Sequence, residues 1–504
     1  MSNHLFDAIR TAAPGKAPFI RTKDGRTWTY NDTLTLSSRI AGAMQTLGIH
    51  PGDRVAVQVE KSAEALILYL ACLRSGAVYL PFNMAYTLAE LEYFIGDAEP
   101  RLVVVSSAAR ENVEKIAKPH YVIVETLDAD GSGSLLDLAR DEPANFVDAS
   151  RSADDLAAIL YTSGTTGRSK GAMLTQANLL SNAIMLRDYW RVTAEDRLIH
   201  ALPIFHTHGL FVATNVTLLA GASMFLLPKF DPDEVISLMP LATMLMGVPT
   251  FYVRLLQSPR LDSQAVANMR LFVSGSAPLL AETHVEFENR TGHAILERYG
   301  MTETNMNTSN PYDGDRIAGT VGFPLPGVTV RVTDPGTGAI LFPEETGMIE
   351  IKGPNVFKGY WRAPERTAAE FTADGFFTSG DLGKIDRRGY VHIVGRSKDL
   401  VISGGYNIYP KEVEGEIDQL EGVAESAVIG VPHPIFGEGV TAIVVPKPES
   451  ALDEEAILSA LKHRLARYKQ PKRIIFAEDL PRNTMGKVQK NVLRKQYADL
   501  YVRA

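Results

Sequence analysis

The chain reads DLAAILYTSGTTGRSKG over residues 155–171, so a short apolar run leads directly into a segment dense in glycine, serine and threonine. Residues 155–161 have the length and composition of a buried strand. Gly164 and Gly167 permit positive φ, which lets successive backbone N–H groups converge on an anion. The segment predicts a phosphate-binding loop, although its order GRSKG excludes the Walker A type, which needs Gly-Lys-Ser/Thr. Four hydroxyl groups and one cation support the prediction of a phosphate-binding loop: those of Thr162, Ser163, Thr165, Thr166 and Lys170.

On the N-terminal side of this loop, β-rich runs alternate with helical patterns. Strands are expected at 54–60, 77–82 and 101–106. A helix is expected over 63–75, and two further helix starts carry capping signals. Thr87 is followed by Glu90, and Thr175 precedes a helix through Leu186. The alternation predicts an α/β fold with largely parallel sheets covered by helices.

Beyond residue 330 short strand candidates are separated by turn clusters such as DPGTG, TADG and DRRG. Residues 330–396 are therefore expected to form an antiparallel subdomain. A compact β/α pattern follows, with helices at 411–419 and 452–467 and strands at 425–431, 440–446 and 473–477. We place a domain boundary at residue 396, between an N-terminal domain (1–396) and a C-terminal domain (397–504).

Composition and charge narrow the class of protein. The 504 residues exceed what one hydrophobic core supports. A net charge of −8 argues against a nucleic-acid partner. The single cysteine, Cys72, cannot form an intramolecular disulfide, which suits a reducing compartment. The N-terminus lacks the layout of a secretion signal and no apolar run is long enough to span a membrane, so a cytoplasmic protein without a membrane partner is expected.

Further motifs follow the phosphate loop in a fixed order. They are SGSAPL (274–279), RYGMTE (298–303), TSGDLG (378–383), GRSKDLVISGGYNIYP (395–410) and PRNTMGKVQK (481–490). Together with YTSGTTGRSKG they resemble the motifs of the acyl-adenylate-forming superfamily, which contains acyl-CoA synthetases and aryl-CoA ligases. The resemblance covers nearly the whole chain. It implies two helix-covered mixed or parallel sheets, a small β-barrel-like subdomain, and a small mobile α+β C-terminal domain that carries a catalytic lysine.

The resemblance also implies an ATP site. Thr302 would contact the α-phosphate, and Glu303, a hard oxygen ligand, would hold Mg²⁺. Tyr299 would stack on adenine. The alternative interpretation of Tyr299 is an aromatic side chain of the core, and that of Glu303 is a carboxylate that caps a helix. The complete set implied for ATP is Thr162, Ser163, Gly164, Thr165, Thr166, Gly167, Lys170, Gly275, Ser276, Ala277, Pro278, Tyr299, Gly300, Asp381 and Arg396.

The C-terminal motifs imply a cation, a hinge and a tunnel. Lys487 would enter the site during adenylation. The other catalytic residues would be Thr302, Glu303 and His206. Acylation of Lys487 would remove its charge and stop adenylation. Lys398 takes the hinge position. The tunnel for coenzyme A would be lined by Ser403, Gly404, Gly405 and Tyr406. Residues 461–504 hold 12 Lys or Arg against 3 Asp or Glu, which indicates either a solvated basic surface or a partner for the CoA phosphates.

For the acid, the resemblance extends to bacterial malonyl-CoA synthetases through HALPIFHTHGLF (200–211), GVPTFYVRLLQSPRL (247–261) and RYGMTETNMNTSNPYDG (298–314). Arg254 is the candidate for the distal carboxylate, because a guanidinium matches a carboxylate bidentately. It could instead pair elsewhere or extend from a helix to solvent. The rest of the pocket would be His206, Thr207, His208, Ser274 and Met306.

The resemblance therefore implies an ATP-dependent malonate–CoA ligase that forms malonyl-CoA, AMP and pyrophosphate through malonyl-AMP. Methylmalonate is also expected to fit, because Met306 is interpreted as a packing wall. Three alternatives stay open: a ligase for another small carboxylic acid, a module that loads a carrier protein, and a non-catalytic nucleotide sensor.

Overall fold

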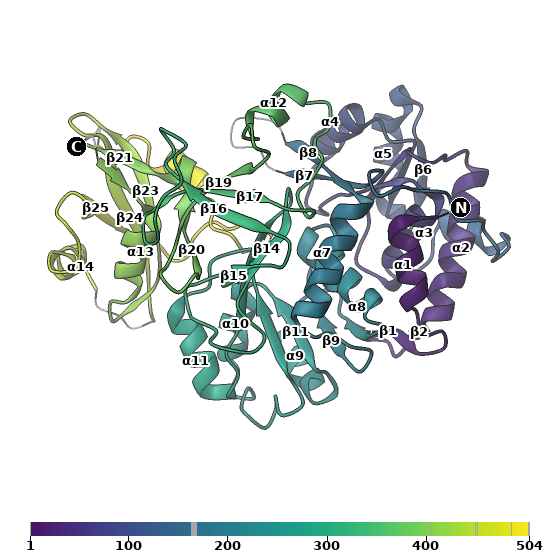
Figure 1. Ribbon diagram of the computed structural model, residues 1–504, viewed down its shortest axis with the longest axis horizontal. Helices are drawn as coiled ribbons and strands as arrows, with labels where there is room; N and C mark the ends of the chain where they lie inside the picture. Colours follow the sequence, from purple (N-terminus) through teal and green to yellow (C-terminus); the bar gives the residue numbers. More distant parts are fainter. Residues whose placement is uncertain are drawn as a thin grey trace. The chain divides into compact units, whose positions relative to one another are not determined.

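The protein is described by a computed structural model that covers residues 2–162, 169–404, 406–448, 450, 452–484 and 486–501 (Figure 1). The chain forms two compact units, one of Met1–Thr329 and Ile351–Phe377 and one of Val330–Glu350 and Thr378–Ala504. Residues 330–350 and 378–396 therefore group with the C-terminal unit, whereas the sequence pattern assigned them to the N-terminal domain. The domain boundary at residue 396 stays a prediction.

One sheet of the first unit contains the strand that leads into the phosphate loop. Its seven strands have the order β18-β8-β7-β4-β3-β5-β6. The strands from β7 to β6 pair parallel, and β8 and β18 continue the sheet antiparallel. The predicted strands at 54–60, 77–82, 101–106 and 155–161 are confirmed as β3 (Arg54–Gln58), β4 (Val78–Pro81), β5 (Leu102–Val105) and β7 (Leu156–Thr162), joined by β6 (Ile123–Thr126), β8 (Lys170–Thr175) and β18 (Gly359–Tyr360).

The second sheet of this unit has nine strands in the order β15-β14-β13-β12-β11-β9-β10-β1-β2. The six strands from β13 to β1 pair parallel, as the β–α alternation predicts. Their carboxyl ends therefore meet at one edge of the sheet. The bounds are β1 (Pro18–Thr22), β2 (Thr27–Thr29), β9 (Arg197–His200), β10 (Ser223–Leu226), β11 (Met244–Gly247), β12 (Leu271–Ser274), β13 (Leu296–Met301), β14 (Asn305–Ser309) and β15 (Phe323–Pro324).

Helices cover these sheets. Side chains of α9, α10 and α11 pack on β9, β11 and β12, and Figure 1 shows these helices grouped beside the sheet. α7 contacts β7 and β8 of one sheet and β14 of the other. Thr87 and Thr175 close capping boxes at α4 and α7, as predicted. The bounds are α1 (His4–Ala12), α2 (Tyr30–Thr46), α3 (Ala63–Ser75), α4 (Leu88–Ala98), α5 (Arg110–Ala117), α6 (Ser134–Arg140), α7 (Gln176–Tyr189), α8 (Asn215–Leu219), α9 (Pro232–Leu238), α10 (Pro249–Leu256), α11 (Ala281–Thr291) and α12 (Pro364–Ala369).

The second unit contains two smaller sheets. The first is an open sheet of β16 (Thr329–Thr333), β17 (Gly347–Lys352), β19 (Phe377–Ile385) and β20 (Val391–Arg396), and no closed barrel is found in the part of the chain described. In the other sheet β25 pairs parallel with β24, and the remaining strands follow the order β22-β21-β24-β23. The bounds are β21 (Val401–Ser403), β22 (Tyr406–Ile408), β23 (Val423–His433), β24 (Gly437–Pro446), β25 (Arg473–Phe476), α13 (Pro410–Asp418), α14 (Glu454–Leu461) and α15 (Lys490–Gln496).

The helix predicted over 452–467 is shorter than expected. α14 begins after Asp453, whose side chain accepts a hydrogen bond from the Ala456 N–H, and ends at Leu461. The following residues form turns, because only isolated hydrogen bonds such as Leu465 N–H to the Leu461 carbonyl continue.

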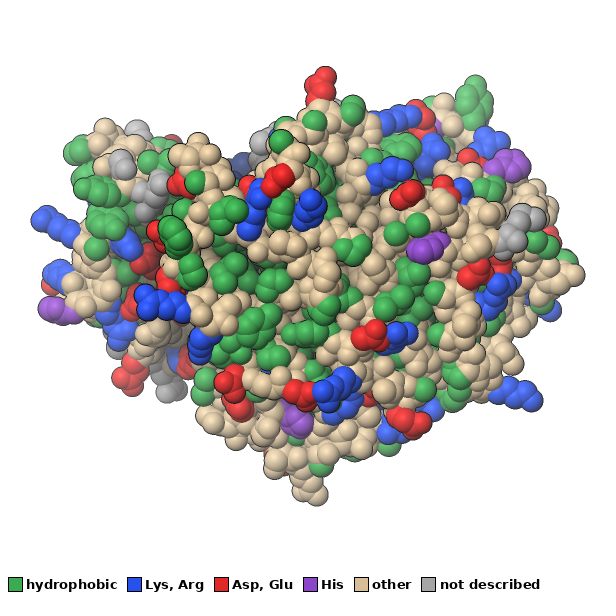
Figure 2. Space-filling view, viewed as in Figure 1, with side chains coloured by type: hydrophobic (Ala, Val, Ile, Leu, Met, Phe, Trp, Pro, Cys, Tyr) green, Lys and Arg blue, Asp and Glu red, His purple; other side chains and the backbone are tan. Residues whose placement is uncertain are grey.

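The surface gives no separation of charge on the face that Figure 2 shows, where Lys and Arg lie among Asp and Glu. Of the helices described, none combines the length and apolar character that crossing a bilayer requires.

Candidate active site

The phosphate loop connects two antiparallel partners, since Thr162 at the end of β7 lies opposite Lys170 at the start of β8. This register places the ends of the loop side by side at the edge of the seven-stranded sheet. Five residues of the predicted ATP set lie outside the described residues: Ser163, Gly164, Thr165, Thr166 and Gly167.

Glu303 lies in the turn between β13 and β14 and is buried, with 7% of its surface exposed. Its Oε1 is 3.1 Å from the Tyr360 hydroxyl and 3.5 Å from Thr162 Oγ1. The Tyr360 hydroxyl also lies 2.7 Å from Glu370 Oε2. Lys170 Nζ lies 3.6 Å from Glu370 Oε1 and 4.9 Å from the centre of the Tyr360 ring. The phenol therefore links the predicted metal ligand to the predicted phosphate-loop cation.

This linkage has an electrostatic consequence. Burial and the two carboxylates, Glu303 and Glu370, raise the pKa of Tyr360 well above its usual range. The phenol consequently stays protonated and has one hydrogen to donate. It can satisfy only one carboxylate at a time, so a cation that binds Glu303 would leave the phenol to Glu370.

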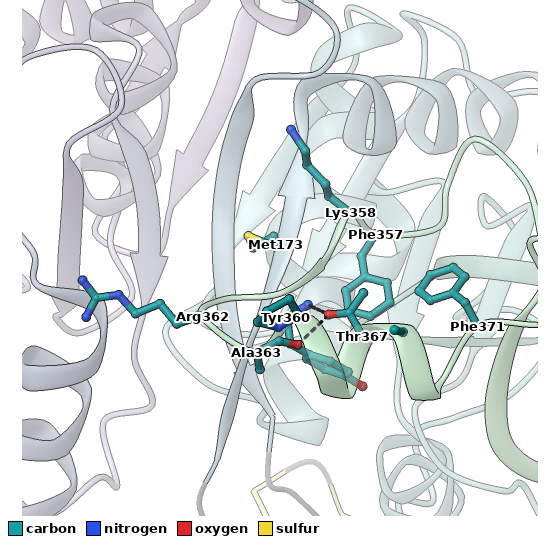
Figure 3. Close-up of a pocket in the computed structure, with 10 residues that line it drawn as sticks. Met173, Phe357, Lys358, Tyr360, Arg362, Ala363, Thr367 and Phe371 are labelled. Atoms are coloured by element: carbon teal, nitrogen blue, oxygen red, sulfur yellow. Dashed lines mark hydrogen bonds between the residues drawn. The ribbon is translucent and has the colours of Figure 1, made fainter.

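A pocket of about 620 Å³ lies between β18 and α12, beside Tyr360 (Figure 3). Within it, the Tyr360 N–H donates to Thr367 Oγ1 at 2.9 Å, and Thr367 Oγ1 donates to the Ala363 carbonyl at 3.0 Å. These bonds hold β18 against α12. Tyr360 lines the pocket, and none of the predicted site residues does.

The residues around Glu303 fit a magnesium ion held together with a nucleotide. No group of three or more His, Cys, Asp or Glu side chains with metal-binding geometry is found within the described ranges. Mg²⁺ bound to nucleotides commonly uses one or two carboxylates and takes its remaining ligands from phosphates and water. One buried carboxylate beside Thr162 meets that requirement, so Glu303 and Thr162 are the residues that would hold the ion.

The segment Gly275-Ser276-Ala277-Pro278 follows the carboxyl end of β12, next to β13, which carries Tyr299 and Gly300. Ser276 has a φ of 73°, a left-handed conformation that costs a non-glycine residue energy. This conformation brings Ser276 Oγ within 3.3 Å of His208 Nδ1. The predicted adenine wall is thus coupled to the predicted acid pocket.

At the same sheet edge lies a cluster of buried polar side chains, which we call the anion cluster: Thr207, His208, Ser274 and Arg298. Each has at most 3% of its surface exposed. Five of their polar atoms have no hydrogen-bond partner among the described residues: Thr207 Oγ1, His208 Nε2, Ser274 Oγ, and Arg298 Nε and Nη2. Buried polar groups are normally paired, so these atoms are available to a ligand that accepts hydrogen bonds.

Arg298 supplies the charge of the anion cluster. It lies in β13 so close to the backbone of Gly275 that a Cβ there would stand 2.4 Å from its Cζ, which makes glycine necessary. Burial lowers the pKa of Arg298 to about 9, so the side chain is still a cation at neutral pH. No carboxylate within the described segments forms an ion pair with it. Burial, Arg298 and His206 lower the pKa of His208 well below its usual range, which keeps that imidazole neutral.

Met306 forms a wall near this cluster and is 2% exposed. The side-chain amide of Asn182 on α7 forms two hydrogen bonds with the backbone of Met306: it donates to the Met306 carbonyl at 2.9 Å and accepts from the Met306 N–H at 3.3 Å. A Cβ on Gly300 would stand 2.6 Å from Met306 Cε. The backbone of Met306 is therefore fixed, and its thioether lies against β13. The predicted residue His206 is half-buried, and its Nδ1 accepts from the His208 N–H at 3.3 Å.

No hydrogen bond or ion pair joins Arg254 to the anion cluster within the described residues, so its role as the carboxylate ligand stays a prediction. Tyr252 and Leu255 form the buried face of α10, so Arg254 lies on the exposed face. Its guanidinium lies over the Phe230 ring, 5.0 Å from the ring centre. The interpretation of Arg254 as the carboxylate ligand rested on the resemblance of its segment and on the bidentate match of a guanidinium to a carboxylate. Arg298, which the sequence analysis missed, is buried and has two donor nitrogens without a partner among the described residues, as this role needs. The sequence signal that could have indicated it is a cation within the strand LERYGM.

In the second unit, Asp381 on β19 lies opposite Arg396 on β20, and Arg396 Nε lies 2.6 Å from Asp381 Oδ1. Lys398 follows in a short 3₁₀ turn, Ser397–Asp399, and is exposed. Lys487 is half-buried, and its N–H donates to Asn483 Oδ1 at 2.9 Å. Burial and the positive charge of Arg396 lower the pKa of Lys487 to about 8.

The predicted CoA tunnel begins at the hairpin of β21 and β22. Ser403 is buried, Gly404 has a φ of 59° and donates its N–H to the Phe436 carbonyl at 2.9 Å, and Gly405 lies outside the described residues. Tyr406 is 57% exposed and stacks on Tyr468, with 4.6 Å between ring centres.

Comparison with known proteins agrees with this architecture. Residues 6–361 match the model of the AMP-binding enzyme family, and residues 412–487 match the AMP-binding enzyme C-terminal domain. A feruloyl-CoA synthase from an Amycolatopsis species is 36% identical over 94% of both chains. A malonate–CoA ligase from Arabidopsis thaliana is 34% identical over 98% of this chain and 90% of its own. The crystal structure of ATP-bound MatB from Rhodopseudomonas palustris is 61% identical, with a TM-score of 0.98 over 99% of this chain and 100% of its own.

The fold and the matched residues thus define an ATP-dependent, adenylate-forming enzyme. The chain belongs to the AMP-binding enzyme family. Within that family it is an AMP-forming acid–thiol ligase, that is, an acyl-CoA ligase.

Proposed function

We propose that this acyl-CoA ligase acts on malonate and also accepts methylmalonate. The observation that carries the proposal is the anion cluster, above all the buried Arg298 guanidinium, two of whose donor nitrogens have no hydrogen-bond partner among the described residues. A monocarboxylic acid loses its only charge when it becomes an acyl-AMP. A dicarboxylate keeps its second carboxylate through both steps, so it alone compensates a permanent buried cation throughout the reaction. The malonate–CoA ligase among the relatives points in the same direction.

The chemistry would proceed in two steps. First, one malonate carboxylate oxygen attacks the α-phosphorus of ATP, the bond from that phosphorus to the bridging oxygen breaks, and pyrophosphate leaves. Thr302, Lys170 and Lys487 would stabilise the charge that develops on the phosphate oxygens. Mg²⁺, when held at Glu303, would supply further charge neutralisation to the phosphates. Next, the CoA thiolate attacks the malonyl carbonyl carbon, the bond to the phosphate oxygen breaks, and AMP leaves.

Pocket size would select the chain length. Met306 is a flexible side chain on a fixed backbone, so a methyl branch on the acid can be accommodated by rotation of the thioether. A longer dicarboxylate would have to move the backbone that Asn182 holds.

An acid panel tests the proposal. We expect ATP and CoA to give pyrophosphate and a thioester of the right mass with malonate and, at a lower rate, with methylmalonate, but roughly 10²-fold less product with succinate, acetate or propionate. A preference for acetate or propionate would instead favour a ligase for another small acid. Release of no pyrophosphate with any acid would favour a nucleotide sensor, and a phosphopantetheine carrier offered in place of CoA tests the carrier-loading alternative.

For coenzyme A we propose the exposed aromatic surface of the second unit as the nucleotide contact. Besides the stacked Tyr406 and Tyr468, it includes Phe436, which is 38% exposed. Lys472 Nζ lies 3.8 Å from the centre of the Phe436 ring. Aromatic faces suit an adenine and a neighbouring ammonium suits its phosphates, so Lys472 is the residue of the basic tail that we assign to CoA.

Substitution Lys472→Glu should raise the KM for CoA by roughly five- to tenfold, because an attraction of the size of an exposed ion pair becomes a repulsion. The KM values for ATP and malonate should not change. Lys462→Glu, the same change at an exposed position at the end of α14, is the matched control. Equal KM values for CoA in the two variants would contradict the assignment.

A further inference from the structure

A lysine distant from every motif is directed into the first unit. Lys61 lies between β3 and α3, and its Nζ is 2.7 Å from the His200 carbonyl oxygen, 2.8 Å from the Leu202 carbonyl oxygen and 3.0 Å from His200 Nδ1. Burial lowers the pKa of Lys61 well below its usual value. No carboxylate in the described part of the chain pairs with it, so its contacts are two carbonyls and one imidazole.

These contacts fix the protonation of His200. His200 Nε2 lies 2.9 Å from the Gly209 carbonyl oxygen, which can only accept, so Nε2 must carry a hydrogen. The imidazole is neutral, because burial and Lys61 lower the pKa of His200 well below its usual range. Nδ1 is then an acceptor and must receive a hydrogen from Lys61. An ammonium with three N–H donors matches its three acceptors, whereas a neutral amine has two donors and would leave one acceptor unserved.

The other end of this chain of bonds holds part of the anion cluster. Residues His208–Thr214 form a π-helix, a rare geometry that often marks functional sites. The Gly209 carbonyl in its first turn accepts from His200 Nε2 and from Thr214 Oγ1, the latter at 3.0 Å. A Cβ on Gly209 would stand 2.0 Å from the Pro203 carbonyl oxygen, so the 200–203 segment presses directly on the π-helix. Thr207 and His208 stand at the N-terminal end of this helix.

We propose that Lys61 is a positioning residue of the acid-binding site. It acts through His200: its ammonium donates to Nδ1 and so keeps the ring hydrogen at Nε2, which holds the π-helix that presents Thr207 and His208. This inference rests on the proposed function, since it takes the anion cluster as the acid site. Lys61 does not contact the acid; without it, His200 can adopt the other tautomer, which places two acceptors against each other at Gly209.

The test uses full-length variants, with KM for malonate and for ATP measured separately. Lys61→Met and His200→Leu should each raise the KM for malonate by about tenfold and leave the KM for ATP within twofold. His200→Gln should recover most of the loss, because its amide can still donate to the Gly209 carbonyl. The double variant Lys61→Met/His200→Leu should be no worse than either single one, because both break the same link.

Arg74→Met is the matched control for stability. Arg74 is a buried cation of α3 whose Nε lies 2.6 Å from Asp148 Oδ1, so this change should lower the melting temperature without changing the ratio of the two KM values. An equal rise of both KM values in Lys61→Met, or an unchanged KM for malonate, would overturn the proposal.

A second readout does not depend on activity. In ¹⁵N-histidine-labelled protein, His200 should show the Nε2–H tautomer, and Lys61→Met should shift its nitrogen resonances toward the Nδ1–H form. Unchanged resonances in Lys61→Met would overturn the inference. Wild-type protein that releases no pyrophosphate with malonate would refute the proposed function instead, and the histidine resonances would still decide the role of Lys61.

Discussion

Replacing Lys487 with glutamine should lower the rate of malonyl-AMP formation by roughly 10²- to 10³-fold, the usual cost of removing one group that stabilises developing charge. Thioester formation from malonyl-AMP and CoA should fall much less, because a lysine carried by a mobile C-terminal domain would have left the site when CoA binds. Glutamine also imitates an acylated lysine, so the same variant tests whether acylation of Lys487 would switch the enzyme off. The two half-reactions are measured as malonate-dependent ATP–pyrophosphate exchange and as CoA consumption with supplied malonyl-AMP.

Lys495→Gln is the matched control, since Lys495 is an exposed lysine of α15 and should change neither half-reaction. Equal losses in both half-reactions of Lys487→Gln would contradict the assignment of this lysine to adenylation.

The pKa of Lys487 adds a dependence on pH. With a pKa of about 8 in the free enzyme, the ammonium is present below that pH and is lost as the pH rises through it. The kcat/KM for malonate in the exchange assay should therefore fall above about pH 8, since this parameter reports groups of the free enzyme. Lys487→Arg should retain some activity and lose this fall, because a guanidinium stays charged. A flat wild-type profile up to pH 9.5 would contradict the lowered pKa of Lys487.

The sequence predicted those parts of the fold whose signals are local. The helix expected over 63–75 is α3, because Ser62 caps its start and Gly76, with a φ of 72°, ends it. The nucleotide motifs were found for the same reason, since each is a continuous segment. The phenol of Tyr360 reaches Glu303 across 57 positions and Lys61 reaches His200 across 139 positions. Such pairs leave no local pattern, so they could be found only after the strands were placed.

The acid site shows a different limit. Arg254 stands among apolar residues in FYVRLL, yet the helical period turns it outward while Tyr252 and Leu255 turn inward. Arg298 stands among polar neighbours in LERYGM, yet its strand lies inside the nine-stranded sheet and buries it. The hydrophobicity of the neighbouring residues therefore does not indicate which of the two arginines is buried.

Replacing Arg298 with methionine should lower kcat/KM for malonate by roughly 10²- to 10³-fold, the range expected when one partner of a buried charge pair is removed. Activity with propionate should persist or rise, because an acid without a second carboxylate no longer leaves a buried guanidinium without a counter-charge. The specificity would therefore reverse toward monocarboxylic acids. Arg254→Met is the matched control and should leave the malonate rate within about threefold, as for an exposed side chain.

Stability separates this role from a structural one. Among the described residues no carboxylate pairs with the buried Arg298 cation, and burial lowers its pKa. Arg298→Met should therefore leave the melting temperature of the free protein unchanged or raise it, whereas removal of a structural arginine would lower it. Malonate should raise the melting temperature of the wild type and fail to do so in the variant. If Arg254→Met abolished malonate turnover and Arg298→Met did not, the distal carboxylate would bind at the exposed face of α10, and the unpaired donors of the anion cluster would serve another ligand.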